Sequence, residues 1–200
     1  ELRAIEDLPA PPAWPPALAA CLLERRLATL WPSAGVRVAL LSQAGRGGDA
    51  AAVAIGRVVD DPGSLRRRAD GRPEAREPVA VAHAGELTLA VGAAGGIGCD
   101  IEPVAPRGAS TWRDLLGAAG FTLAELIARE GKDGLDAAAS RVWSAAEAVK
   151  KAGGVGGLTL GAVSGDWVAL DAGALRVATW VGVVGDAAHA VAVAHRPPMA

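Results

Sequence analysis

The sequence predicts a mixed α+β fold in which most strands pair with their chain neighbours through tight turns. Three observations support this prediction. Short runs of alternating apolar residues flank tight turns near residues 78–91 and 174–195. Segments 18–30 and 137–151 space their apolar residues by three and four, which is typical of helices. Hydrophobic residues make up 51% of the 200-residue chain, which is enough for a buried core and excludes global disorder.

The first half begins with a proline-rich segment, residues 8–16, which we expect to be extended because proline disfavours helix interiors and central strands. A helix is expected next, at 18–30. The further elements expected in this half are strands at 36–41 and 51–58, a short helix at 64–70 ended by Gly71, and a hairpin of strands 78–82 and 86–91 around the turn His83-Ala84-Gly85.

The second half is expected to combine strands and helices in a similar way. The helix at 137–151 is expected to stop at Gly153 and Gly154. The other expected elements are a strand at 97–102, a helix from Ser110 or Thr111 through Gly117, a helix beginning at Thr122, and strands at 167–170, 174–184 and 189–195. The hairpin segments HAGELTLAV and GDAAHAVAV resemble each other, which suggests a duplicated unit.

Charge and composition exclude several classes of protein. The chain has 20 basic and 22 acidic residues, so we expect no nucleic-acid partner and no anionic membrane partner. The longest uncharged run, Leu8 to Leu23, is 16 residues with five prolines, whereas a membrane helix needs about 20 apolar residues. Cys21 and Cys99 are too few for a disulfide framework or a structural zinc site. With no signal peptide visible, the expected compartment is the cytoplasm.

The predicted strand Ile97-Gly98-Cys99-Asp100-Ile101-Glu102 carries the first candidate site. Alternation along a strand sends Ile97, Cys99 and Ile101 toward a core and both acids to the opposite face. Two adjacent carboxylates repel, so one pKa should rise unless a cation lies between them. Hard oxygen ligands of this kind suit Mg²⁺. The alternative is an exposed strand face with two solvated acids.

Three further candidate sites each have a plain structural alternative. Trp143, Glu147 and Lys151 share one helix face, but Glu147 and Lys151 are also spaced for an ordinary helical ion pair and Trp143 for a core position. His83 lies in the predicted turn, where it is equally explained as a polar turn residue. Glu125 follows Thr122 with the spacing of a helix capping box.

The order of these motifs resembles that of a known family. Residues 71–151 contain, in order, Gly71-Arg72-Pro73, Ala82-His83, the strand 97–102, Phe121-Thr122-Leu123-Ala124-Glu125, and the segment 143–151, WSAAEAVKK. The order resembles the 4′-phosphopantetheinyl transferases of the surfactin-synthetase type. Their signature has Gly-Lys-Pro, Ser-His, (V/I)-G-(V/I)-D-x-E, Phe-Ser-x-x-Glu and W-S-x-K-E-A-x-x-K.

The resemblance implies an activity and a set of site residues. Family members transfer the 4′-phosphopantetheine arm of coenzyme A to a serine of an acyl carrier protein and release 3′,5′-ADP. The implied Mg²⁺ ligands are Asp100, Glu102 and Glu147. Glu147 is also the implied catalytic base, with Glu125 as the second candidate. The implied coenzyme A contacts are Arg72, His83 and Lys151, and Lys151 would also stabilise the leaving group.

The resemblance also implies an architecture and a setting. It predicts a pseudo-twofold duplicated fold of mainly antiparallel sheets with packed helices, with residues 1–95 as the first half and 96–200 as the half that carries most of the active site. A chain of this length is expected to be competent as a monomer. With its start without Met, the chain resembles the integrated transferase domain at the C-terminal end of an iterative, enediyne-type polyketide synthase. The carrier protein would then be a separate chain or a domain of the same synthase.

The chain departs from the family signature at two positions. Ala146 stands in place of a lysine, and Ala82 in place of a serine. These departures support an alternative in which the domain keeps the transferase fold but serves as a non-catalytic docking or scaffold domain. A further alternative is an unrelated Mg²⁺-dependent phosphohydrolase that needs no carrier protein.

Overall fold

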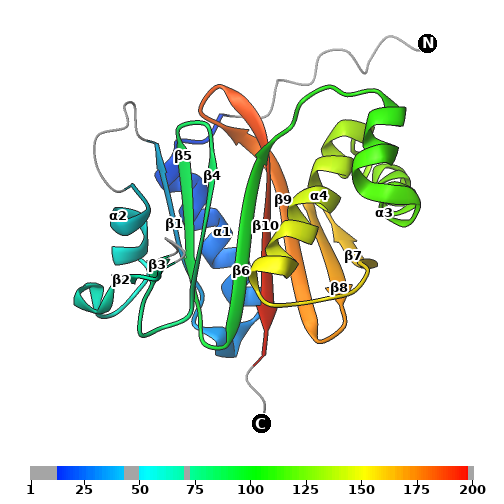
Figure 1. The fold of residues 1–200 in the computed structure, drawn as a ribbon. Helices are drawn as coiled ribbons and strands as arrows, with labels where there is room; N and C mark the ends of the chain where they lie inside the picture. Colours follow the sequence, from blue (N-terminus) through cyan, green and yellow to red (C-terminus); the bar gives the residue numbers. More distant parts are fainter. Residues whose placement is uncertain (1–12, 43–49, 70–72, 198–200) are drawn as a thin grey trace.

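Two antiparallel sheets lie at the centre of the protein and share one core (Figure 1). The structure, a computed structural model, describes residues 13–42, 50–69 and 73–197. These residues form a mixed α+β fold in which neighbouring strands of the sheets pair in antiparallel fashion, as predicted. No helix in these ranges is both long and apolar enough to cross a membrane.

The first sheet has three strands in the order β1-β5-β4, with bounds β1 (Arg37–Ser42), β4 (Val79–Ala84) and β5 (Leu87–Gly92). Ala84 pairs with Leu87, which confirms the hairpin. The two-residue turn begins at Gly85, whose φ of 56° favours glycine. The turn therefore lies later than predicted, and His83 belongs to β4 rather than to the turn.

The second sheet has five strands in the order β6-β10-β9-β8-β7. Their bounds are β6 (Gly96–Pro103), β7 (Thr159–Ser164), β8 (Trp167–Ala172), β9 (Leu175–Val184) and β10 (Ala187–Arg196). β7 is a strand that the sequence pattern did not predict. This strand is the exposed edge of the sheet, and its register shifts between Leu160 and Ala162, so it lacks the apolar alternation that marks a half-buried strand.

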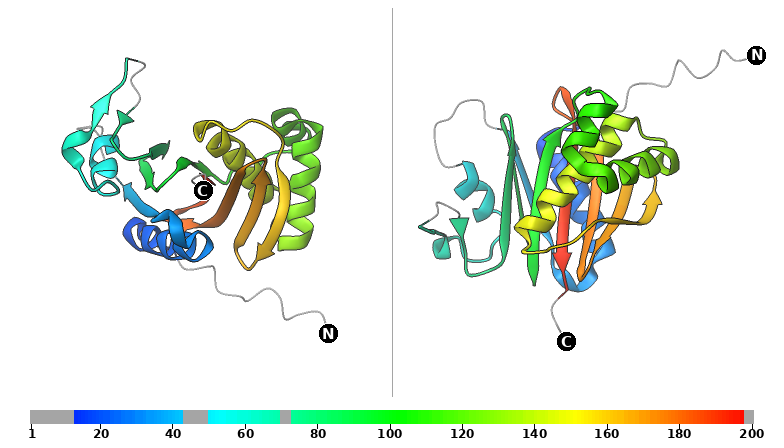
Figure 2. Two further views of the ribbon diagram at one scale, coloured as in Figure 1. Left: turned by 90° about the horizontal axis from the view of Figure 1, so that it is seen from below. Right: turned by 45° about the vertical axis from the view of Figure 1, so that its right-hand side comes forward.

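Helices cover both faces of these sheets (Figure 2). The α-helices are α1 (Pro16–Leu30), α2 (Ala50–Gly56), α3 (Ala109–Gly131) and α4 (Leu135–Lys151), and the 3-10 helices are η1 (Pro32–Ala34) and η2 (Pro62–Ser64). Of the proline-rich lead-in, residues 8–12 lie outside the described ranges. Trp14 forms a bridge to Val184, and Pro16 already begins α1.

Two predictions in the first half are wrong. Residues 51–58 form mainly α2 rather than a strand, because alanine is the best helix former and Ala54, Ile55, Val58 and Val59 are buried at helical spacing. The predicted helix at 64–70 is instead the end of η2 followed by β2 (Arg66–Arg67), which pairs with β3 (Pro73–Glu74).

The third correction concerns the helices before α4. The sequence predicted one helix ending at Gly117 and another capped by Thr122. In the structure α3 is continuous except for a break at Gly117, where φ is 68° and ψ is 174°. Thr122 therefore lies inside the second helical segment, and the predicted capping box with Glu125 is not formed.

Three apolar clusters hold the layers together. The first joins α1 to both sheets, for example through Leu23, Leu89 and Ile101. The second packs α3 and α4 on the opposite face of the second sheet, and the third packs α2 on the first sheet. The second sheet is therefore covered by α1 on one face and by α4 on the other.

Candidate active site

A glycine in β6 determines how closely α4 approaches the second sheet. A Cβ atom at Gly98 would lie 2.0 Å from the backbone oxygen of Ala148 in α4. No side chain fits at that distance, so glycine is required for this packing. The close approach brings the last two turns of α4 over the outward face of β6. The residues of β6 on this face are Gly98, Asp100 and Glu102, while Ile97, Cys99 and Ile101 enter the shared core as predicted.

A buried arginine fixes α4 along its own axis. Arg141 is only 1% exposed, and its Nε donates a hydrogen bond of 2.7 Å to Oδ2 of Asp133 in the α3–α4 loop. Its Nη2 donates to the backbone oxygen of Asp166, between β7 and β8, at 2.9 Å. Arg141 therefore connects α4 to the α3–α4 loop and to the turn between β7 and β8. These contacts help to fix the position of the acidic and basic residues at the C-terminal end of α4.

Lys151 contacts Asp100 across the helix–sheet interface. The Nζ of Lys151 donates to Oδ1 of Asp100 at 2.8 Å, and the Asp100 side chain is 8% exposed. Oδ2 of Asp100 is buried without a hydrogen-bond partner among the described residues. One oxygen of this carboxylate is therefore satisfied by an ammonium group, and the other is not satisfied.

The pKa of Asp100 is raised above its ordinary value. Burial is the main cause, since it disfavours the charged form, and the negative charge of Glu147 adds to it. The hydrogen bond and charge of Lys151 oppose the rise, as does the nearby hydroxyl of Ser144. The negative charge of Glu147 in α4 therefore acts on the strand acid across the helix–sheet interface.

Glu102 belongs to the same charged group. Its pKa is raised mainly by burial and then by the charge of Asp100. A side-chain hydrogen bond with Trp143 and the charges of Arg107 and Lys151 oppose the rise. The sequence left Trp143 open between a core position and a member of the candidate site, and in the structure this residue of α4 is half-buried and lies beside Glu102.

Glu147 pairs with a different lysine from the one that the sequence suggested. The Nζ of Lys150 donates to Oε1 of Glu147 at 2.6 Å, whereas the predicted helical pair joined Glu147 to Lys151. Lys151 points to Asp100 instead, because it projects from the side of α4 that lies over β6. Each of the two lysines therefore holds one of the acids that the resemblance assigns to Mg²⁺.

The fit to a divalent cation is partial as the side chains stand. Within residues 13–42, 50–69 and 73–197, no three His, Cys, Asp or Glu side chains are gathered closely enough to hold a metal ion. The donors are nonetheless suitable, because Asp100, Glu102 and Glu147 are hard oxygen ligands and Oδ2 of Asp100 is a buried acceptor without a donor. A cation would satisfy that oxygen and oppose the burial and the repulsion between carboxylates that together raise the pKa values of Asp100 and Glu102.

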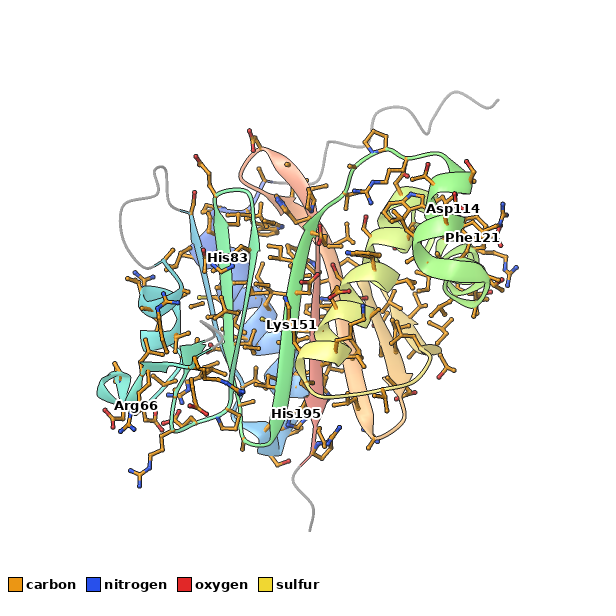
Figure 3. The ribbon with its side chains drawn as sticks, viewed as in Figure 1. Arg66, His83, Asp114, Phe121, Lys151 and His195 are labelled. Atoms are coloured by element: carbon orange, nitrogen blue, oxygen red, sulfur yellow. The ribbon has the colours of Figure 1, made fainter. Side chains whose placement is uncertain are left out.

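His83 and Arg72, the predicted contacts from the first half, have different outcomes. His83 is exposed on β4 and alternates with the core residues Ala82 and Ala84, so it points away from the shared core as Asp100 does on β6. β4 and β6 lie side by side (Figures 1 and 3). Arg72 lies outside the described residues. Ala82, which stands where the family signature has a serine, is 3% exposed and faces the core.

Glu125, the second candidate base, lies on α3 rather than on α4 or β6. It is exposed on α3, and no hydrogen bond or ion pair joins it to the described acids or to Lys151. Phe121, which precedes it in the same motif, is buried in the α3–α4 core beneath the guanidinium of Arg113 at 4.3 Å. This motif therefore has a packing role in the described structure.

A groove of about 340 Å³ opens beside Glu147. It lies between α3, α4 and the loop that precedes β7, and its walls are largely apolar. The α4 residues that line it are Val142, Trp143, Ala146, Glu147 and Lys150. Ala146 is the position at which the related signature has a lysine, so the small side chain leaves this space open.

Two other residues of β6 are explained by their packing. Cys99 is fully buried, and burial raises the pKa of its thiol to about 12, which excludes a reactive thiolate at neutral pH. Gly98 was not singled out as a site residue in the sequence analysis. The available signal was a glycine in the middle of an apolar strand, which indicates a close backbone approach.

Comparison with known proteins does not identify a family. A scan against protein-family models finds no match, and a search of curated proteins finds no similar sequence.

Proposed function

We propose that the protein is a Mg²⁺-dependent phosphopantetheinyl transferase that moves the 4′-phosphopantetheine arm of coenzyme A to a serine of an acyl carrier protein. One observation carries this proposal. Asp100 in β6 contacts Lys151 in α4, 51 positions away in the sequence, where α4 crosses β6. Glu102 follows Asp100 on the same strand face, and Glu147 lies one turn before Lys151 on α4.

The arrangement suits the proposed chemistry. When bound, Mg²⁺ would be held by Asp100, Glu102 and Glu147 and would neutralise charge on the phosphoryl oxygens of coenzyme A. Lys151 supplies a cation for the phosphate that leaves as 3′,5′-ADP. Glu147 borders the open groove, so its carboxylate is accessible to a serine hydroxyl and is a better candidate for the base than Glu125.

The strand order supports the duplicated architecture that accompanies this function. In both sheets the strand that comes last in the chain lies between two earlier ones: β5 lies between β1 and β4 in the first sheet, and β10 lies between β6 and β9 in the second. We propose that residues 1–95 and 96–200 are the two halves of a pseudo-twofold fold. His83 would then contribute to coenzyme A binding from the first half. A polyketide synthase is the proposed setting.

Incubation with coenzyme A, Mg²⁺ and an apo acyl carrier protein tests the activity. The expected result is a carrier protein heavier by one phosphopantetheine, and no gain when a chelator is present. An unmodified carrier protein in the presence of Mg²⁺ overturns the proposal. Because a phosphohydrolase leaves the carrier protein unmodified, the same measurement separates that alternative from the proposed reaction.

A non-catalytic docking or scaffold domain is the second candidate function. The observation that favours it is that Lys151 and Lys150 hold Asp100 and Glu147, so the three acids do not form a metal group as they stand. Calorimetric titration with coenzyme A in the presence of Mg²⁺ separates the two functions. Measurable binding supports the transferase, and the absence of binding supports the scaffold.

A further inference from the structure

We propose that a cavity between α1 and the β8–β9 hairpin binds a flat aromatic ring that carries a carboxylate. The cavity has a volume of about 440 Å³, which is within the size range of small-molecule sites. The residues that line it include Trp14, Arg25, Arg26, Asp166, Trp167 and Trp180. We refer to it as the tryptophan cavity.

The tryptophan cavity is separate from the candidate active site. Trp180 belongs to the apolar cluster that joins α1 to the sheets, and Trp14 and Trp167 pack against that cluster. Val168, the next residue of β8, belongs instead to the cluster beneath α4. The cavity therefore lies on the α1 face of the second sheet, opposite to α4, and the inference goes beyond the proposed function without depending on it.

Backbone pairing brings the three indole rings together. Trp167 and Trp180 are register partners on β8 and β9. The N–H of Trp14 donates to the backbone oxygen of Val183 at 2.8 Å, and the carbonyl of Trp14 accepts from the N–H of Gly185 at 3.2 Å. Tryptophans from distant parts of the chain are therefore fixed around one space by main-chain hydrogen bonds.

The ring of Trp180 is also fixed by its side-chain contacts. A Cβ at Gly182 would lie 2.0 Å from Cζ2 of this ring, so the glycine leaves the space that the indole fills. The indole Nε1 donates to Oδ2 of Asp166 at 2.7 Å. Trp180 is nearly buried, so the accessible indole surface comes mainly from the half-buried Trp14 and Trp167. Rings held in place in this way lose little conformational entropy when a ligand stacks on them.

Arg26 supplies a cation whose hydrogen bonds are not all used. Its guanidinium carbon lies over the Trp167 ring, 6.0 Å from the centroid. Its Nη2 donates to the hydroxyl of Ser164 at 3.3 Å, and its Nε is buried without a partner among the described residues. Within the same residues no ion pair joins Arg26 to an acid.

The free hydrogen-bonding capacity of Arg26 suits a carboxylate. Nε and Nη2 are neighbouring donors of one planar fork, whose geometry matches the two oxygens of a carboxylate. A ligand carboxylate that replaced the long contact with Ser164 would accept from both donors. It would also pair a guanidinium group that the described acids leave unpaired.

The balance of charge in the tryptophan cavity favours a singly charged anion. Two guanidinium groups, those of Arg25 and Arg26, face one carboxylate, that of Asp166, which already accepts from Trp180. Indole rings alone would also suit a cation, but the excess of positive charge disfavours it. The charge of Asp166 disfavours a dianion more than a monoanion. Because flat rings stack on indole faces, an aromatic monocarboxylate meets both requirements.

Calorimetric titration of the full chain at pH 8 with indole-3-acetate and with its neutral amide, indole-3-acetamide, tests the inference. We expect saturable binding of the acid and about tenfold or more weaker binding of the amide, because the hydrogen bonds to a charged group are lost. Equal affinities for the two compounds, or no saturable binding of the acid at millimolar concentrations, overturns the inference. This comparison needs no variant.

Two arginine variants locate the binding site. Arg26→Met is expected to lower the affinity for indole-3-acetate about tenfold or more and to change the affinity for the amide by about twofold or less. Arg113→Met is the matched control, because Arg113 also lies over an aromatic ring, 4.3 Å from Phe121, but on α3 and outside the cavity. The control is expected to bind the acid like the parent protein. Parent-like binding by Arg26→Met, or an equal loss in both variants, overturns the inference.

Trp167→Leu tests the contribution of the ring separately from that of the charge. This variant is expected to bind both the acid and the amide more weakly, because stacking is lost for either compound. Unchanged affinities for both in the folded variant contradict the inference. Where a variant fails to fold, the comparison of acid and amide on the parent protein still decides.

The transfer assay gives an independent result. A parent protein that binds indole-3-acetate through Arg26 but leaves the carrier protein unmodified retains the tryptophan cavity as a site and overturns the proposed function. A parent protein that modifies the carrier protein without binding indole-3-acetate retains the proposed function and overturns this inference.

Discussion

The two sheets have a similar strand order but very different outward faces. In the first sheet that face is apolar and is covered by α2, with Ala54, Ile55 and Val58 packed against Ala39 and Ala90. In the second sheet the matching face carries two carboxylates beneath α4. The same arrangement of strands and a covering helix therefore forms an apolar core in the first half, whereas in the second half it holds charged residues.

The two halves also share a device that brings the helical layer onto the sheet. A Cβ at Gly92 in β5 would lie 2.4 Å from the backbone oxygen of Val58, just after α2, and a Cβ at Gly98 in β6 would lie 2.0 Å from that of Ala148 in α4. Close packing is therefore common to both halves. The acids beside Gly98 distinguish the second half.

Glu147→Ala and Glu125→Ala are expected to give the largest contrast. Glu147 lies beside the buried acids and the groove, whereas Glu125 is exposed on α3. We expect Glu147→Ala to lower the initial rate of carrier modification by about 100-fold or more, since a metal ligand and base are lost together. Glu125→Ala is expected to keep a rate near that of the parent protein. A slower Glu125→Ala than Glu147→Ala would reverse the assignment of the base.

Gly98→Ala and Gly92→Ala break the matched packing in each half. Both are expected to lower the free energy of unfolding by about 1–3 kcal/mol, because a methyl group overlaps a backbone oxygen. Denaturant unfolding measures this loss. Only Gly98→Ala is expected to lower the transfer rate of the remaining folded protein, because α4 moves away from Asp100. Equal rates for the two folded variants would contradict this role of Gly98.

Lys151→Ala separates binding of the metal from the chemical step. We expect a slower transfer rate with no loss of metal affinity, because Lys151 stabilises the leaving group and does not bind the metal. Steady-state rates and calorimetric metal affinities of the same preparation provide the comparison. A parallel loss of both would show that Lys151 supports the metal site itself.

The sequence predicted elements with a strong apolar periodicity correctly and elements without it less well. The hairpin of β4 and β5, the helices α1 and α4, and the facing of Asp100 and Glu102 away from the core follow from strong periodicity. The strand predicted at 51–58 was wrong because a run of alanine and valine suits a helix and a strand alike.

The sequence grouped the residues of the candidate site into one hypothesis but did not predict the contacts between them. The spacing of motifs brought Asp100, Glu102, Glu147 and Lys151 together as one hypothesis. The pairing of Lys151 with Asp100 was not predicted, because helix spacing describes partners on the same helix and not those on the strand beneath it. That contact depends on the close approach at Gly98.

His83→Ala tests the smaller contribution expected from the first half. Because His83 is exposed on β4, loss of one hydrogen bond to a charged substrate group is expected to raise the KM for coenzyme A by about three- to tenfold. The value of kcat should change little. A fall in kcat as large as that of Lys151→Ala would place His83 at the reacting centre.

Glu102→Gln is expected to have the smallest effect, and the effect depends on pH. Burial and Asp100 raise the pKa of Glu102 in the folded protein, so folding favours its protonated form. Its unfavourable contribution is absent below the unfolded pKa and grows as pH rises through the folded pKa. Without added metal, the variant should therefore have a higher Tm than the parent protein at pH 8, and the difference should shrink at pH 4. A larger gain at pH 4 would contradict this account.

The most direct test of the central claim is the intact mass of an apo acyl carrier protein after incubation with coenzyme A, Mg²⁺ and either the parent protein or Asp100→Ala. The account predicts one added phosphopantetheine with the parent protein and an unchanged mass with folded Asp100→Ala. Equal modification by both proteins, or by neither, would contradict it.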